Sequence, residues 1–241
     1  MENIETPLTK EELWLKERES LGAIVDSCGT EIEEGIKDTL VALRLLGFNT
    51  SSSCEGHTEE LNSPYIHIEA PDEPKYRFAD QIEIHKKLAD KYQLPLEDID
   101  LAINGGWGHD TRIKLFEEID QDFWNIMEKS EYLESNDWLQ WNQNNHALDE
   151  KIKYLLIEFY ANKKELRPEI KLGLSYIGPG HMPNLRSGAE LEGNEKFNTN
   201  FSSQFKNEME KRAWTIQYIK DAQKEMQDFT EFLKKKYFEE M

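Results

Sequence analysis

The chain has 241 residues, which is enough for one large domain or two small ones. Aromatic residues make up 11% and charged residues 32% of the sequence, which is typical of a helix-rich protein with solvated helix faces. The 48 acidic and 29 basic residues give a net charge of -19, which disfavours binding to nucleic-acid backbones and to anionic membranes.

No run of residues approaches the ~20 apolar residues of a membrane span, and the N-terminus lacks a hydrophobic signal core. The two cysteines, Cys28 and Cys54, do not have the spacing of a disulfide framework. We therefore expect free thiols and a cytoplasmic location, where thiols stay reduced.

Two helices are predicted before residue 50. Thr9 and Glu12 form a capping box at the start of the first helix. The second helix is the clearest element of the sequence, because apolar residues recur at helical spacing. Thr30 is its expected N-cap, and Gly47 is expected to end it in a left-handed conformation.

Residues 48–54 and 64–70 predict a β-hairpin with a long loop from Glu55 to Asn62. The second strand alternates strictly, with two isoleucines on one face and three polar residues on the other: Tyr65, His67 and Glu69. The register decides the face of Cys54. A loop centred near Glu59 places Cys54 with the isoleucines, and a shift of one residue reverses this.

Further along the chain, a helix is expected over 73–93, and Pro95 ends it. The glycine-rich stretch 104–108 marks a turn, and residues 111–116 fit either a strand or the start of a helix. A helical pattern runs over 137–163. Two short strands flank residues 179–183 and suggest a second hairpin.

Residues 194–201 are expected to form a linker, and a long helix follows from Ser203. The summed pattern predicts an α+β fold, with a small mixed or antiparallel sheet built from hairpins and covered by helices. We expect a single domain over 1–200. The C-terminal helix, 201–241, then packs on this domain or on a partner, including a second copy of the chain.

Cys54 and His57 have the C-x-x-H spacing, which allows both to bind one metal ion from a single turn. His67 and Glu69 are two residues apart on one strand face and can converge on the same point. A thiolate, two imidazoles and a carboxylate suit zinc, and three of them would leave one position open for water. Glu55 is then a candidate general base.

Two other interpretations are open for the same loop. In a metal-free site, Cys54 is a nucleophile and His57 is its base. In a purely structural loop, serine hydroxyls satisfy the backbone, Gly56 provides a positive φ, and Cys54 is an inert buried thiol.

Other candidate residues are fewer. Arg186 follows the second turn and can clamp a carboxylate or phosphate, or it can be a surface arginine of a hairpin. His109 lies in the glycine-rich turn. His85 and His146 lie in polar helical stretches and are expected at the surface.

The stretch 43–69, with Leu-Gly followed by Ser-Cys-Glu-Gly-His and a Pro-aromatic strand, resembles a group of bacterial proteins without an assigned activity. The segments 154–160 and 185–191 are also similar to this group, so the resemblance spans residues 35–192 with gaps. A shorter resemblance, over Ser52 to Gly56, is to the wybutosine-synthesising tRNA methyltransferase family and implies an RNA-modifying enzyme. This sequence has His57 where that family has arginine, and the added acids disfavour an anionic RNA.

The leading hypothesis for the function is a small-molecule hydrolase or transferase that depends on a metal, with zinc as the candidate, or on Cys54 and His57. The first alternative is a non-catalytic interaction protein that acts through its acidic surface and C-terminal helix. An RNA-modifying enzyme is the second alternative.

Overall fold

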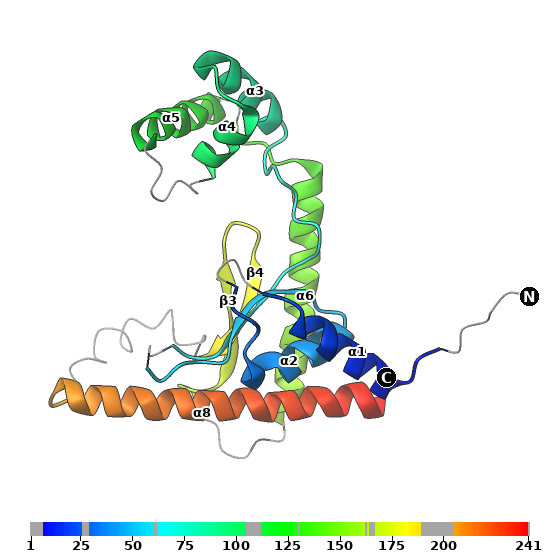
Figure 1. The fold of residues 1–241 in the computed structure, drawn as a ribbon. Coiled ribbons are helices and arrows are strands. Elements are labelled where there is room, and N and C mark those ends of the chain that lie inside the picture. Colours follow the sequence, from blue (N-terminus) through cyan, green and yellow to red (C-terminus); the bar gives the residue numbers. More distant parts are fainter. Residues whose placement is uncertain are drawn as a thin grey trace, which may run out of the picture. The chain divides into compact units, whose positions relative to one another are not determined.

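The computed structural model describes residues 7–25, 29–59, 62–104, 112–129, 131–161, 163, 167–188 and 205–240. Its elements are α1 (Lys10–Gly22), α2 (Glu34–Leu45), β1 (Thr50–Cys54), β2 (Tyr65–Ile68), α3 (Gln81–Tyr92), α4 (Leu96–Ile103), α5 (Ile113–Lys129), α6 (Asn136–Ala161), β3 (Leu172–Ile177), β4 (Met182–Ser187), α8 (Glu208–Lys235) and a π-helical turn, η3 (Lys236–Glu240). The four strands form one antiparallel sheet, which confirms the predicted α+β class (Figure 1). Within the described ranges, no helix is both long enough and apolar enough to cross a membrane.

The chain divides into two compact units. Unit 1 comprises residues 1–71 and 144–241, and unit 2 comprises residues 72–143. Within the range 1–200 that was expected to form one domain, residues 72–143 form a unit of their own, and α8 is part of unit 1. Residues 194–201, the expected linker, lie outside the described residues.

The first helices of unit 1 begin where backbone amides find side-chain acceptors. Thr9 caps α1, and the reciprocal hydrogen bonds with Glu12 confirm the predicted capping box. The N-cap of α2 is Glu33, so the prediction of Thr30 at this position was wrong. Gly47 has a φ of 81°, as predicted for the residue that ends this helix.

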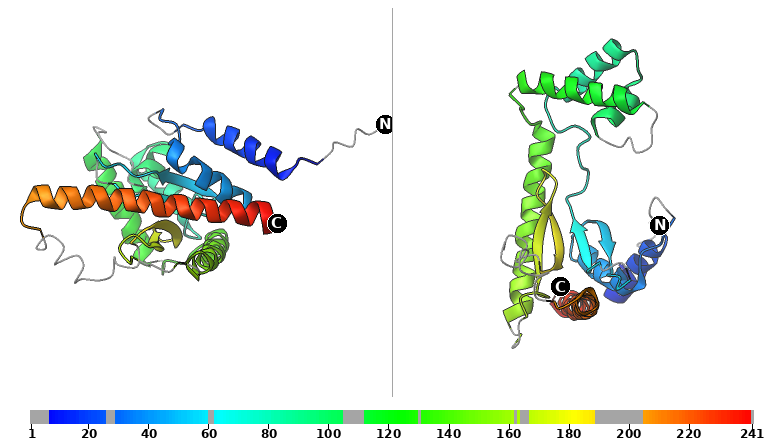
Figure 2. Two further views of the ribbon diagram at one scale, coloured as in Figure 1. Left: turned by 90° about the horizontal axis from the view of Figure 1, so that it is seen from below. Right: turned by 90° about the vertical axis from the view of Figure 1, so that its left-hand side faces the viewer.

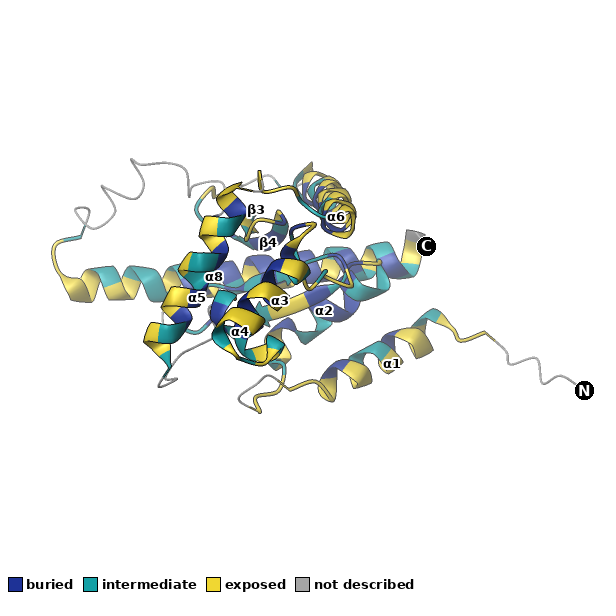
Figure 3. Ribbon diagram, turned by 90° about the horizontal axis from the view of Figure 1, so that it is seen from above, coloured by how far each residue is buried: buried dark blue, intermediate teal, exposed yellow. Residues whose placement is uncertain are grey.

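The core of unit 1 lies between the sheet and the helices α2, α6 and α8. Ile66, Ile68 and Leu185 of the two central strands are completely buried, and Phe229 of α8 belongs to the same core. Figure 2 shows α8 running beside α2, and Figure 3 shows buried positions along both helices, whereas α1 is largely exposed. Ile66 and Ile68 contribute to one apolar face of the sheet, as the alternation of residues 64–70 predicts.

The strand order is β1-β2-β4-β3, so the two predicted hairpins pair through β2 and β4. Thr50 lies opposite Ile68, but Ser52 lies opposite His67, so β1 contains a bulge with one extra residue. Beyond the bulge, Cys54 lies opposite Tyr65. The register shifted by one residue is therefore the one that forms. Cys54 lies on the face of the sheet that carries Tyr65, and not on the face of the isoleucines.

Unit 2 contains α3, α4 and α5 around an apolar core of its own, which includes Ile84, Ile99 and Phe123. The sequence left residues 111–116 open, and Ile113 onward is helical. His85 was expected at the surface, and this prediction was wrong: it is completely buried, with Nδ1 2.7 Å from the carboxylate of Asp100. His109 lies outside the described residues.

Candidate functional site

Three side chains that can bind a metal meet in unit 1: Glu33, Cys54 and His57. One ligand atom from each lies within 4.8 Å of the other two. Among the described residues, this is the only group of three such side chains. The structure thus brings the predicted pair Cys54 and His57 together, and it adds a carboxylate that the sequence analysis did not select.

Three elements position this cluster. Glu33 precedes the first turn of α2, Cys54 ends β1, and His57 lies in the loop between β1 and β2. A pair of backbone hydrogen bonds, 2.9 and 3.0 Å long, joins His57 to Asn62 and closes this loop. The turn into it depends on Gly56, whose φ is 90°.

The Glu33 carboxylate connects the helix to the loop. Its Oε1 lies 2.5 Å from His57 Nε2, and its Oε2 accepts a hydrogen bond of 2.6 Å from the backbone N–H of Glu55. The Glu33 and His57 side chains are 27% and 33% exposed, so solvent reaches both. The loop is therefore held against α2 by a carboxylate that solutes can also approach.

Cys54 is 9% exposed, and its Sγ accepts a hydrogen bond of 3.3 Å from the backbone N–H of Gly56. The thiolate is the form of cysteine that binds metals and acts as a nucleophile, and a thiolate at this position could accept the same hydrogen bond. Cys28, the other predicted free thiol, lies outside the described residues.

Glu55, the candidate general base, is directed elsewhere. Its Oε2 accepts a hydrogen bond of 2.7 Å from the backbone N–H of Gly35, in the first turn of α2. A carboxylate at this position complements the positive end of the helix. Any side chain at Gly35 would collide with this carboxylate. Glu55 therefore fixes the loop to α2 and is not part of the three-residue cluster.

His67 and Glu69, the other predicted metal ligands, do not join the cluster. The His67 ring packs against the Tyr65 ring with a centroid distance of 4.9 Å and a tilt of 32°, and its strand neighbours are Ser52 and Asn184. Burial lowers the pKa of His67, so the neutral imidazole is favoured there. Glu69 follows β2 and is half-buried.

Arg186, the predicted anion contact, lies in β4 and is half-buried. Its neighbours across the sheet are Tyr65 on β2 and Gly173 on β3. The same row of the sheet continues to Cys54, which lies opposite Tyr65. The sheet thus places Arg186 two strands away from the cluster.

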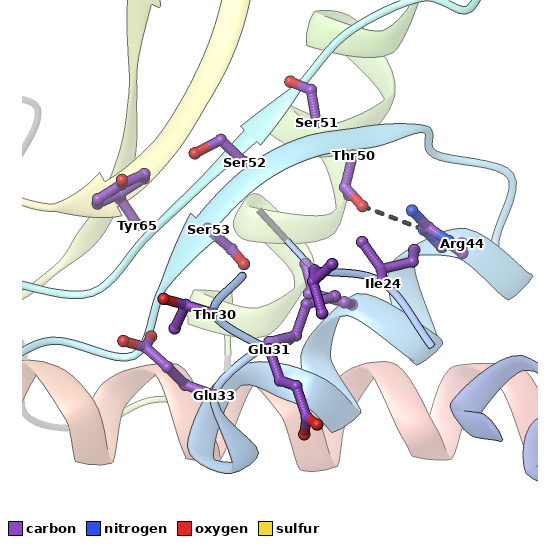
Figure 4. Close-up of a pocket in the computed structure, with 13 residues that line it drawn as sticks. Ile24, Thr30, Glu31, Glu33, Arg44, Thr50, Ser51, Ser52, Ser53 and Tyr65 are labelled. Carbon is purple, nitrogen blue, oxygen red and sulfur yellow. Dashed lines mark hydrogen bonds between the residues drawn. The ribbon is translucent and has the colours of Figure 1, made fainter. Parts of the chain in front are cut away.

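A pocket of about 340 Å³ lies beside the cluster, between β1 and the segment that precedes α2. Glu33 lines this pocket and is also a member of the cluster. Figure 4 shows its carboxylate at one end of the view and Arg44, bonded to Thr50, at the other. The hydroxyl-bearing residues of the lining are Thr30, Thr50, Ser51, Ser52, Ser53 and Tyr65.

The three ligand types fit zinc, which accepts thiolate, imidazole and carboxylate ligands. Two ligands of one tetrahedral ion, each about 2.0–2.3 Å from it, lie about 3.3–3.8 Å apart. Because Glu33 Oε1 and His57 Nε2 are 2.5 Å apart, they form a hydrogen bond here and must separate by roughly 1 Å to bind a metal. Both side chains are partly exposed, so rotation of the side chains can supply this separation while the loop backbone stays fixed.

Glu33 could not be selected from the sequence, because it is 24 positions before His57 and no local motif connects the two. Because Thr30 was expected to be the N-cap of α2, Glu33 was expected inside the helix rather than at its start. The only available signal was the acid-rich start of α2, which is common at helix N-termini.

Comparisons with protein-family profiles, curated proteins and solved structures find no match for this chain. The resemblances at Ser52 to His57 therefore stay predictions. The side chains of the site are the basis for its proposed function.

Proposed function

We propose that Glu33, Cys54 and His57 bind one zinc ion, and that this site carries out metal-assisted hydrolysis or group transfer on a small molecule bound in the adjacent pocket. The observation that supports the proposal is the cluster itself, in which three ligand atoms of different chemistry lie within 4.8 Å of one another. Three protein ligands with a fourth open position are typical of catalytic rather than structural zinc sites.

Each side chain has a distinct role in this proposal. The Cys54 thiolate and the His57 imidazole bind the ion, and the Gly56 N–H orients the sulfur. Glu33 has two oxygens, so Oε1 can bind the ion while Oε2 still accepts the Glu55 N–H. When bound, zinc would activate a water molecule and polarise an acceptor group of the substrate.

The pocket favours a small, polar substrate. Its lining combines hydroxyl groups with two carboxylates, Glu31 and Glu33, and with aliphatic side chains. The Arg44 guanidinium donates to Thr50 and also pairs with Glu17 at 3.2 Å, so much of its charge is compensated. We therefore infer a neutral or hydroxyl-rich substrate rather than a multiply charged anion.

The test is the metal content of protein purified without chelators and without a metal-affinity step. We expect about one equivalent of zinc, and loss of this zinc in the H57A and C54S variants. The E31Q variant is the matched control, because it removes a pocket carboxylate outside the cluster. The H67A variant is a second control and should retain the zinc.

Two outcomes would contradict the proposal. One is protein without stoichiometric zinc that also fails to bind added zinc or cobalt. The other is zinc that persists in both H57A and C54S. Loss of zinc in H67A but not in H57A would move the site to the ligands that the sequence alone suggested.

A metal-free thiol site is the second candidate. It is supported by the N–H bond to Cys54 Sγ and by the presence of His57 in the same cluster. In this case Cys54 would react with iodoacetamide in the folded protein, and H57A would slow the reaction without any effect of chelators. An effect of chelators on this rate would favour the metal site instead.

A further inference from the structure

Two exposed histidines from different elements of unit 1 lie side by side. His146 lies on α6, and His181 lies in the turn between β3 and β4. Their ring centroids are 4.9 Å apart, with an angle of 35° between the ring planes. Neither ring has a hydrogen bond or an ion pair with any other residue in the described part of the chain.

The structure holds the two rings together through neighbouring contacts. Tyr176 of β3 donates a hydrogen bond of 3.1 Å to Asp149, one helical turn after His146 on α6. The Tyr176 ring also packs edge-on against His181, with a centroid distance of 5.9 Å. The turn of this hairpin is therefore fixed beside His146 by contacts that do not use either imidazole nitrogen.

The backbone of the turn is unusual at His181. Its φ is 49°, in the left-handed region that costs a non-glycine residue about 1 kcal/mol. Gly178, in the same turn, has a φ of 63°, where glycine carries no such cost. Asp72, Gln93, Glu131 and Tyr132 also have a positive φ, so this conformation shapes the turn and is not by itself a sign of a ligand.

We propose that His146 and His181 form a second metal site, which binds a divalent transition metal ion such as zinc or nickel through both imidazoles. Two imidazole nitrogens about 2.0–2.1 Å from one tetrahedral ion place the ring centroids roughly 5 Å apart. The measured centroid distance of 4.9 Å is compatible with this spacing. Asp149 and Glu150 on the same stretch of α6 both pair with Lys153, at 2.6 and 3.2 Å, so the two imidazoles alone carry the preference for the metal.

The ion would join the β3–β4 turn to α6. Only the folded protein brings the two imidazoles together, so binding of the ion would stabilise the folded state by mass action. With two protein ligands, the remaining positions are open to water or to a ligand from another molecule. This site shares no residue with the Glu33–Cys54–His57 cluster, so it does not depend on the function proposed above.

The experiment is a zinc titration of the whole chain, followed by the ring-proton NMR signals of His146 and His181. We expect both signals to shift with one common half-saturation. The H146A variant should remove the response of His181, and H181A should remove that of His146, because single-histidine binding is weaker by about tenfold or more. The H57A variant should leave the response of the pair unchanged, and Y176F, which removes the hydrogen bond to Asp149, should weaken the responses of both rings together.

Three results would overturn the proposal. They are the absence of a shift at either ring with equimolar zinc, two unrelated half-saturations, and a His181 response that is unchanged in H146A. Circular dichroism of each variant shows whether it is folded. A folded H146A that retains zinc binding at His181 would show independent surface histidines.

Discussion

Glu33 and His57 share a contact of 2.5 Å between Oε1 and Nε2, and this contact joins the N-cap of α2 to the loop between β1 and β2. The same carboxylate accepts the Glu55 N–H, so one side chain fixes both the loop backbone and the imidazole. A substitution of Glu33 affects the contact with His57 and the contact with the Glu55 N–H at the same time. Changes at Glu33 should therefore alter the loop and the metal affinity together.

The first prediction concerns the link between metal and stability. Zinc at 100 times its dissociation constant should stabilise the folded protein by about 2.7 kcal/mol, because the unfolded chain lacks the assembled site. The E33Q variant keeps an acceptor for the Glu55 N–H but loses the anionic ligand, so most of this gain should disappear. Urea unfolding with and without zinc measures it. Equal gains in the E33Q and unaltered proteins would exclude Glu33 as a ligand.

The second prediction concerns Gly56. A Cβ at this position would lie 2.9 Å from Pro64 Cδ and 3.1 Å from the carbonyl oxygen of Asn62. G56A should therefore cost about 1 kcal/mol for the left-handed backbone and a further 1–3 kcal/mol or so for the collision. Gly29 has a similar φ of 79° and nothing within 4 Å of its Cβ position, so G29A isolates the backbone cost.

Urea unfolding of both glycine variants gives the comparison. G56A should be less stable than G29A, and it should also lose zinc affinity. If G56A and G29A have the same free energy of unfolding, the close approach of Pro64 to residue 56 does not contribute to stability.

The third prediction concerns the thiol. In a C28S background, Cys54 is the only thiol, and metal binding should protect it from alkylation because the sulfur is a ligand. We expect iodoacetamide to react at least about tenfold more slowly when zinc is bound. Mass spectrometry of the alkylated protein at timed intervals measures the rate. Equal rates with zinc and with a chelator would separate Cys54 from the metal.

The fourth prediction concerns pH and unit 2. Burial lowers the pKa of His85, although the Asp100 carboxylate acts in the opposite direction. The unfolded chain then binds a proton at higher pH than the folded unit does, so stability declines as the pH falls below about 6.5. Below the folded-state pKa of His85, this contribution no longer changes.

Hydrogen exchange of the α3 amides, measured between pH 7.5 and pH 5, tests this dependence. The H85Q variant cannot titrate, so its exchange protection should lose the part of the pH dependence that falls below about pH 6.5. The exposed histidine variant H146Q is the matched control and should retain it. The same slope in H85Q and in the unaltered protein would assign the effect to other groups.

The fifth prediction concerns α8. Thr39 of α2 and Thr230 of α8 are both buried, and their hydroxyl oxygens are 2.6 Å apart. Because Thr230 also donates to the Met226 carbonyl, T39V leaves it paired, whereas T230V leaves the Thr39 hydroxyl without its acceptor and should cost about 1 kcal/mol or more. The double variant T39V/T230V should cost less than the sum of the single changes, because it removes that unpaired hydroxyl. A double-mutant cycle by urea unfolding measures the coupling. Strict additivity would show that this contact is not used.

Much of the fold follows from local signals. The capping box at Thr9, the alternation of 64–70 and the turn before β4 are short-range patterns, and each corresponds to an element of the structure. Unit 2 was not predicted, because α4 is only eight residues long and carries no capping signal. Without α4, the partner of His85 was unknown, and a histidine in a charged stretch was assigned to the surface.

The candidate site was predictable only in part. The spacing of Cys54 and His57 placed both residues in one turn, and the structure keeps them in one cluster. The third member comes from the start of α2, and its approach depends on how the helix packs on the hairpin. His67 was selected from its i, i+2 relation to Glu69, but the bulge in β1 and the pairing with β4 determine its neighbours.

The buried hydrogen bond between the backbone N–H of Ala70 and Asn145 Oδ1 is 2.6 Å long. It joins the end of the first segment of unit 1, residues 1–71, to the start of its second segment, residues 144–241. The exit and return points of residues 72–143 are thus neighbours on the scaffold of unit 1. An inserted module with adjacent ends can be gained, lost or exchanged during evolution without disturbing its host. Relatives that lack these residues altogether would be expected to keep the same sheet.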